Sequence, residues 1–238
     1  RVFMQMDEGL ELANEGDRVI YFERISEFAE ADPVIIFTIR RRCMCGYCTV
    51  KCPVAIEARP VFTALRELLA SAGVTSEKGF ESTQVDREWH IFSVYRAVYG
   101  IDYTDLPPIE QALERGADTL FFPGCPLVSY APALTREVFA FLESHGMNAV
   151  ISEACCGSPL KSAGFGDRAR AHKQRLADRI KAAGIKRIVC VCPGCMKELL
   201  DATPCMKDLE FVALPAILRD AGITIGSGSL AEIILPQE

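Results

Sequence analysis

Residues 119–125 read Thr119-Leu-Phe-Phe-Pro-Gly-Cys125, a short apolar run that ends in a turn carrying a cysteine. The pattern occurs twice more. Residues 148–152 (Asn148-Ala-Val-Ile-Ser152) precede Cys155-Cys-Gly157, and residues 187–192 (Arg187-Ile-Val-Cys-Val-Cys192) lead into Cys192-Pro-Gly-Cys195. Short apolar runs bounded by turn residues predict buried strands. A cysteine turn therefore follows each of three predicted strands.

Helical patterns separate these strands. We expect helices over residues 131–145 and 166–183, and a fourth strand over residues 210–214. Strands that alternate with helices favour a small parallel sheet in an α/β layer. Because parallel strands share one direction, the three cysteine turns are expected to meet at the end of the sheet where open α/β sheets bind ligands.

The N-terminal half has a different, mostly helical pattern. We expect helices over residues 7–15 and 18–30, an amphipathic helix from Pro60 to Gly73, a helix over 86–99, and a linker over 105–108. The apolar face of the amphipathic helix carries Val61, Leu65, Leu68 and Leu69. The sequence thus predicts a helical domain over residues 1–108 and an α/β domain over residues 109–238.

Charge and cysteine usage restrict the class of protein. The 238 residues carry a net charge of −6, which disfavours a nucleic-acid partner. The 11 cysteines are bunched into short loops and odd in number, which suits a reducing cytoplasm better than a set of disulfides. No signal peptide or apolar run of about 18 residues is visible. We therefore expect a cytoplasmic protein without a membrane span, which could associate with a membrane through a partner.

The first cysteine array reads Cys43-Met-Cys-Gly-Tyr-Cys-Thr-Val-Lys-Cys-Pro53. Cys45, Cys48 and Cys52 fit the ferredoxin pattern C-x2-C-x2-C-x3-C-P of a 4Fe–4S cluster. The first ligand position holds Arg42, so Cys43 is expected to serve as the fourth ligand. A zinc site or reactive thiols are the alternatives, but the run has neither a second cysteine pair nor a nearby histidine.

The second array has five cysteines, one more than a simple site needs: Cys125, Cys155, Cys156, Cys192 and Cys195. Gly124 and Gly157 supply backbone freedom beside them. A helix that starts at Cys192 would favour thiolates and sulfide through its N-terminal amides. A thioredoxin-like dithiol is the alternative for Cys192 and Cys195. The neighbouring cysteine turns favour a second metal cluster, where we expect the chemical step.

On these motifs the chain resembles the cysteine-rich CCG domain of heterodisulfide reductase B- and D-type subunits and of glycolate- and lactate-oxidase iron–sulfur subunits. The motifs are residues 121–125, 155–159 and 192–195. Residues 45–56 resemble the second cluster motif of the C-type subunit of heterodisulfide reductase, a helical ferredoxin. The family's ferredoxin domains carry two cluster motifs, and its D-type and oxidase subunits carry two CCG repeats, whereas this chain has one of each. We expect the missing motif upstream of Arg1 and the present repeat to be a first repeat, so that a fragment and a naturally short subunit are both open.

The resemblance implies an iron–sulfur oxidoreductase subunit with two 4Fe–4S clusters. The first, ferredoxin-type cluster would pass electrons to a CCG cluster that reduces a disulfide. That cluster would be a noncubane cluster with five cysteine ligands, or a cubane that leaves one cysteine for substrate. The alternatives are an electron-transfer subunit beside a flavin oxidase of a hydroxy acid, and a zinc-binding interaction module. The expected partners are flavin- or cytochrome-containing redox subunits, and a small-molecule disulfide or hydroxy acid reached through the complex.

The remaining candidates receive structural interpretations. Cys190 is expected in the core of its strand, with a place beside the cluster as the alternative, and Cys205 is expected to be a free thiol in a loop. His90, His145 and His172 lie in charged helical segments and are expected to be solvated. Trp89 is expected to be a packing residue.

Overall fold

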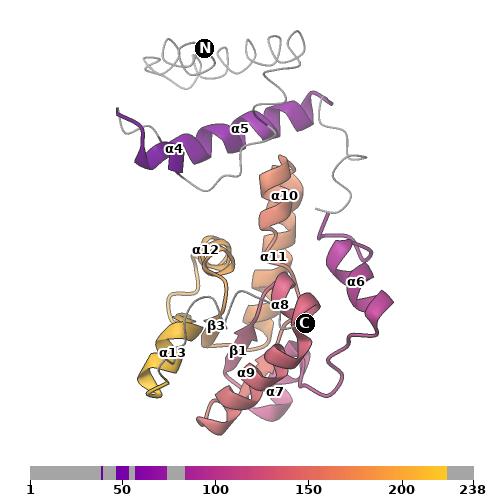
Figure 1. Ribbon diagram of the computed structural model, residues 1–238, viewed down its shortest axis with the longest axis vertical. Helices are drawn as coiled ribbons and strands as arrows, with labels where there is room; N and C mark the ends of the chain where they lie inside the picture. Colours follow the sequence, from indigo (N-terminus) through magenta and orange to yellow (C-terminus); the bar gives the residue numbers. More distant parts are fainter. Residues whose placement is uncertain (1–38, 40–46, 54–56, 74–83, 224–238) are drawn as a thin grey trace, which may run out of the picture. The chain divides into compact units, whose positions relative to one another are not determined.

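The computed structural model describes residues 39, 47–53, 57–73 and 84–223. The chain separates into two compact units, which Figure 1 draws together. The first consists of residues Arg1–Tyr103 and Ala154–Asp178, and the second of residues Thr104–Glu153 and Arg179–Glu238. The helices expected over 7–15 and 18–30 lie outside the described residues. The division into domains at residue 108 stays a prediction.

A parallel four-stranded sheet forms the centre of the second unit. Its strands are β1 (Thr119–Phe122), β2 (Ala149–Ile151), β3 (Arg187–Cys190) and β4 (Glu210–Ala213), in the order β2-β1-β3-β4. Phe122 is paired with Cys190 at the carboxyl ends of β1 and β3. Every residue of β1 and β2 is buried, as expected for apolar runs in a covered parallel sheet. The expectation of an α/β layer with a small parallel sheet is confirmed.

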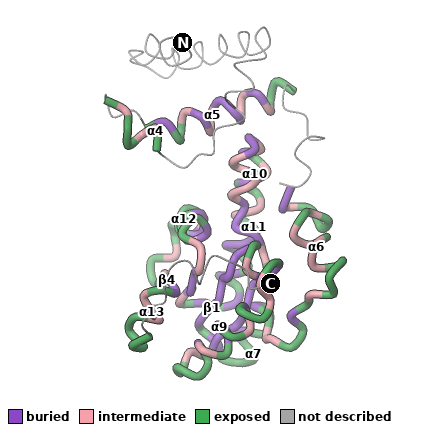
Figure 2. Tube along the Cα trace, in the orientation of Figure 1, coloured by how far each residue is buried: buried purple, intermediate pink, exposed green. Residues whose placement is uncertain are grey.

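Helices of the second unit connect and flank these strands. They are η3 (Ile109–Gln111), α7 (Ala112–Arg115), α8 (Cys125–Tyr130), α9 (Pro132–Ser144), α12 (Pro193–Ala202) and α13 (Leu214–Asp220). Figure 2 shows β1 as buried, and α7 and α13 with many exposed residues. Proline stands in the first turn of α8, α9, α12 and α13, where its missing N–H leaves no helical hydrogen bond unmade.

Residues 105–108 are more than the linker that the sequence predicts. Pro108 forms a parallel bridge to Ile151, and the backbone N–H of Ile151 donates to the carbonyl oxygen of Pro107 at 2.9 Å. The guanidinium of Arg136 donates to both carboxylate oxygens of Asp105, at 2.8 and 3.1 Å, and these hydrogen bonds hold the pKa of Asp105 below its usual range. The segment is thus attached to the edge of the sheet beside β2.

The described part of the first unit is helical. Its helices are α4 (Tyr47–Val50), α5 (Ala58–Ser71), α6 (Ile91–Tyr99) and α10 (Ser158–Ala163), and most of α11 (Gly166–Ala182) belongs to it. Helix α5 begins before the predicted start at Pro60, and it buries Phe62, Leu65 and Leu69. Of the described helices, none combines the length and apolar composition that crossing a membrane requires.

Helix α6 begins at Ile91, later than the predicted start at residue 86. The preceding residue, His90, has an extended backbone, and its N–H donates to the hydroxyl oxygen of Ser93 at 2.9 Å. This hydrogen bond is one half of a capping box, which fixes the first turn of the helix. The segment before His90 is not helical. It is attached to α11 by an ion pair between Asp86 and Arg168 at 2.8 Å.

Candidate metal centre

The cysteine turns after β1 and β3 lie at the same end of the sheet. After β1, Pro123 and Gly124 lead directly into α8, whose first residue is Cys125. After β3, Cys192 is the N-cap residue of α12, and Cys195 lies in the first turn of that helix. Since β1 and β3 are adjacent parallel strands, their carboxyl ends bring these two turns side by side.

Gly124 is the point of closest approach between the two turns. A Cβ atom at this position would lie 3.2 Å from the Sγ atom of Cys195 and 3.8 Å from the Cβ atom of Cys192. The backbone of Gly124 has φ +83° and ψ 158°, a conformation that residues with a side chain scarcely adopt. Glycine is therefore needed here both for backbone geometry and for space beside the cysteine sulfur.

The cysteines of these turns are protected from solvent to different degrees. Cys125 and Cys195 are each 5% exposed, and Cys192 is half-buried. Cys125 and Cys192 are free thiols. The backbone N–H groups in the first turn of α12 point toward its N-terminal end, where Cys192 lies, and their partial positive charge favours anionic sulfur ligands. The second unit thus brings the turn that contains Cys125 against the turn that contains Cys192 and Cys195.

The tandem cysteine turn follows β2 in the chain. The backbone N–H of Ser152 still donates to the carbonyl oxygen of Phe121 at 3.1 Å, which extends the pairing of β2 with β1 by one residue. Cys155 and Cys156 then belong to the first unit and are each 4% exposed. That these two meet Cys125, Cys192 and Cys195 in one site stays a prediction.

His172 of α11 supports the tandem cysteine turn. The sequence alone did not predict this role for the histidine. Its Nε2 atom lies 2.8 Å from the carbonyl oxygen of Cys155. A carbonyl only accepts hydrogen bonds, so Nε2 carries the proton and donates. A Cβ atom at Gly157, where φ is +85°, would lie 3.1 Å from Cδ2 of the same ring. The expectation that His172 is simply solvated is wrong, because the ring packs against this turn and is half-buried.

Arg168, one helical turn before His172, is bonded to the segment that precedes α6. Its Nε and Nη2 atoms donate to the two carboxylate oxygens of Asp86, each at 2.8 Å, and Nη2 also lies 3.3 Å from Oε1 of the buried Gln84. Burial alone would raise the pKa of Asp86, but the hydrogen bonds and charge of Arg168 outweigh it and hold that pKa below its ordinary value of 3.8.

The first cysteine array is described only from Tyr47 onward, and Cys43 and Cys45 lie outside the described residues. Cys48 in α4 and Cys52 after it are both half-buried. Between them, the hydroxyl oxygen of Thr49 accepts a hydrogen bond from the backbone N–H of Ala58 at 3.0 Å. The array is thereby attached to the first turn of α5.

Four other expectations can be compared with the structure. Cys190 is 1% exposed within β3, which confirms its place in the core, and Cys205 is an exposed free thiol. His145 is exposed as expected. Trp89, by contrast, is 65% exposed in the structure and is not the packing residue that the sequence predicts.

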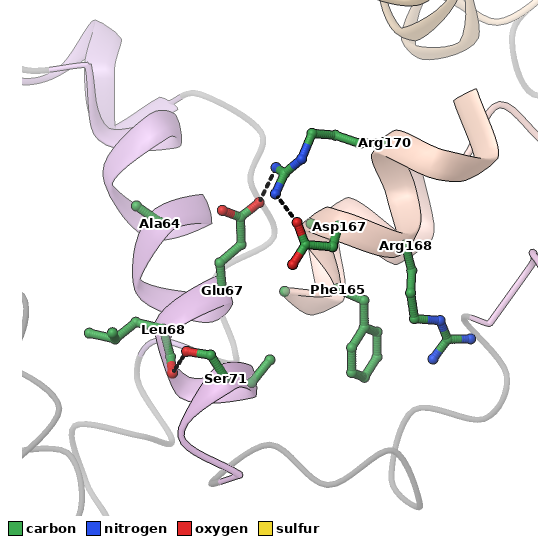
Figure 3. Close-up of a pocket in the computed structure, with 11 residues that line it drawn as sticks. Ala64, Glu67, Leu68, Ser71, Phe165, Asp167, Arg168 and Arg170 are labelled. Atoms are coloured by element: carbon green, nitrogen blue, oxygen red, sulfur yellow. Dashed lines mark hydrogen bonds and ion pairs between the residues drawn. The ribbon is translucent and has the colours of Figure 1, made fainter. Parts of the chain in front are cut away.

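A cavity of about 620 Å³ lies in the first unit between α5 and the start of α11 (Figure 3). Ala64, Leu68 and Phe165 supply apolar surface, while Arg170 contacts the carboxylates of Asp167 and Glu67 at 2.5 and 3.9 Å. None of the described cysteines lines this cavity. It therefore shares no lining residue with the described cysteine turns.

The donor set suits a thiolate-bound metal cluster. Within the described residues no group of three or more Cys, His, Asp and Glu side chains is close enough to hold a metal ion as it stands. The residues nevertheless fit such a group chemically, because buried thiols beside glycine turns are ligands for iron–sulfur clusters and zinc. The space that a side chain at Gly124 would fill lies directly against the Cys195 sulfur.

Comparison with known proteins identifies this part of the chain. Residues 119–199 match the family model of the CCG cysteine-rich domain. The matched span begins with β1 and ends within α12, so it includes all five cysteines of the second array and none of the first. The chain therefore carries a CCG domain, as its cysteine motifs predict. No curated protein and no solved structure matches the chain.

Proposed function

We propose that the chain is an iron–sulfur oxidoreductase subunit that passes electrons from a ferredoxin-type cluster to a CCG cluster, where a disulfide is reduced. The presence of a CCG domain is consistent with an iron–sulfur redox subunit. The observation that carries the proposal is the contact of Gly124 with Cys192 and Cys195, because it brings two remote cysteine turns together at the end of the sheet.

In this proposal Cys43, Cys45, Cys48 and Cys52 hold the first cluster. Cys125, Cys155, Cys156, Cys192 and Cys195 hold the second or leave one thiol for substrate. When bound, such clusters supply one-electron transfer at potentials set by their ligands and surroundings. Reduction of a disulfide consumes two electrons and two protons and releases two thiols. The electrons would come from a flavin- or cytochrome-containing partner subunit.

The protein's own residues would shield and shape the second cluster. Burial of Cys125, Cys155, Cys156 and Cys195 keeps water from the sulfur ligands and lowers the local dielectric. The α12 amides offset anionic charge at Cys192 and Cys195. The hydrogen bond from His172 holds the carbonyl of Cys155, and so restricts the backbone of the tandem turn. Burial, the α12 amides and the His172 hydrogen bond would therefore organise the cluster ligands in the absence of substrate.

Iron and acid-labile sulfide, counted in anaerobically purified protein, test the proposal. We expect about eight iron atoms per chain, from two four-iron clusters. Cys125→Ser should lose about half of the iron, while the matched control Cys205→Ser, at an exposed thiol, should keep all of it. Stoichiometric zinc without labile sulfide would rule out the redox function and leave the zinc-binding interaction module.

A turnover assay separates the two redox functions. With partner subunits present, we expect reduction of a heterodisulfide rather than oxidation of a 2-hydroxy acid. Oxidation of the hydroxy acid alone would make the chain an electron conduit beside a flavin oxidase.

A further inference from the structure

Arg66 is a buried charged residue in the middle of α5, and it lies outside the candidate metal centre. Its side chain is 7% exposed. Burial of a guanidinium is costly unless its N–H groups are hydrogen-bonded. Nε and Nη2 donate to the carbonyl oxygen of Ile39 at 3.2 and 3.1 Å, and Nη1 donates to the carbonyl oxygen of Ser162. One side chain thus joins two segments that are more than a hundred residues apart in the sequence.

Both segments lead directly to cysteines. Ile39 precedes the first cysteine array, and Ser162 belongs to α10, the helix that follows the Cys155-Cys156 turn. The start of α5 is also attached to the array, through the hydrogen bond from Ala58 to Thr49. Helix α5 is therefore hydrogen-bonded to Thr49 within the first array, to Ile39 just before it, and to Ser162 in the helix that follows the tandem turn.

The backbone of α5 lies directly against the glycine that ends α10. At Gly164, with φ +96°, a Cβ atom would overlap the backbone carbonyl of Arg66, and at Gly166 it would overlap the carboxylate of Glu67. Figure 3 shows the side chains of Glu67 on α5 and Arg170 on α11 facing one another, next to this contact. The contact at Gly164 is backbone against backbone and therefore rigid, whereas the Glu67 side chain at Gly166 can move.

We propose that Arg66 is a positioning residue that fixes the separation between the first cysteine array and the tandem cysteine turn. This inference rests on the proposed function. Electron tunnelling weakens steeply with distance, so an intramolecular path needs the two clusters held at a constant separation. The planar guanidinium donates to two carbonyl groups at once, whereas a lysine presents a single point charge.

The test is the magnetic interaction between the two reduced clusters, measured by EPR on the full chain. In Arg66→Met the inter-cluster splitting should be lost or broadened, while the g values of each cluster and the iron content stay those of the unsubstituted protein. Arg66→Lys should weaken the splitting partially. The matched control Arg59→Met, at an exposed position on the same helix, should leave it unchanged. An unaltered splitting in Arg66→Met would overturn the proposal.

A second measurement does not depend on the clusters. Hydrogen–deuterium exchange of the full chain should show about tenfold or faster exchange in residues 158–164 for Arg66→Met, with no change for Arg59→Met. If Arg66→Met does not fold, the same comparison is made with Arg66→Lys. Protection equal to the unsubstituted protein would overturn the role of Arg66. A chain without iron that still shows this exchange difference would refute the proposed function and keep the structural role of Arg66.

Discussion

Gly124→Ala is the substitution that most directly tests the link between the fold and the candidate metal centre. The substitution would strain the backbone and would also crowd the sulfur atom of Cys195. The backbone of Gly124 lies in a region that is essentially restricted to glycine, which costs on the order of 1–3 kcal/mol for alanine. The added methyl would lie 3.2 Å from Sγ of Cys195, so the sulfur must move by a few tenths of an ångström.

The expected loss follows from these two effects. Overpacking of a tight site costs about 1–3 kcal/mol. Together with the backbone strain, Gly124→Ala should lower the free energy of unfolding by about 2–6 kcal/mol. Because the displaced atom is a candidate ligand, iron bound at the CCG site should also fall, whereas the first cluster should keep its iron.

Gly146→Ala is the matched control. Gly146 also has a positive φ, +77°, but nothing lies within 4 Å of a Cβ atom there. This substitution should cost only the left-handed backbone term, about 1–2 kcal/mol, and leave the metal content unchanged. Denaturant unfolding of the chain, together with iron and sulfide counts, makes the comparison. Full iron in Gly124→Ala, with a stability loss no larger than that of Gly146→Ala, would refute the reasoning.

Three further predictions concern other parts of the site. Cys43→Ser should abolish the EPR signal of the first cluster and leave that of the CCG site; an intact first signal would mean that a non-cysteine ligand or a three-iron cluster is present. His172→Phe should remove a hydrogen bond worth about 1 kcal/mol and change the EPR spectrum of the CCG cluster. His172→Gln keeps a donor and should restore much of the original spectrum. Equal spectra in both variants would exclude a role for the bond. Asp86→Asn should lower stability at pH 7 by about 1–2 kcal/mol, since its ion pair with Arg168 is partly exposed.

The effect of Asp86 should depend on pH in a definite direction. Its pKa is lower in the folded protein than its ordinary value of 3.8, so its carboxylate stabilises the fold fully above that value. The stabilisation is lost as the pH falls below 3.8 through the folded-state pKa. The free energies of unfolding of Asp86→Asn and the unsubstituted protein should therefore converge in acid, as measured by urea titrations at a series of pH values. A constant difference down to the lowest pH would contradict the assignment of the ion pair.

The strands and the cysteine turns were predictable from the sequence alone. The apolar runs at 119–122, 149–151, 187–190 and 210–213 are short, local and bounded by turn residues. Because parallel strands share one direction, the turns that follow them are expected at one end of the sheet, and the structure shows this for the cysteine turns after β1 and β3. The CCG domain was also recognisable from the sequence, because each of its three motifs is a short continuous stretch of residues.

The short helices α10 and α13 were not predicted. Helices of six or seven residues contain too few turns to show a clear apolar period, and packing stabilises them rather than their own propensity.

Only the tertiary structure shows which residues support the cysteines. The contact of Gly124 with Cys195, the hydrogen bond from His172 to Cys155 and the attachment of Ile39 and Ser162 by Arg66 each join residues that are remote in sequence. No local pattern of charge or hydropathy distinguishes Arg66 or His172 from the other basic residues of an amphipathic helix. Their roles depend on which carbonyl groups packing brings within hydrogen-bond distance, and the folded chain alone decides that.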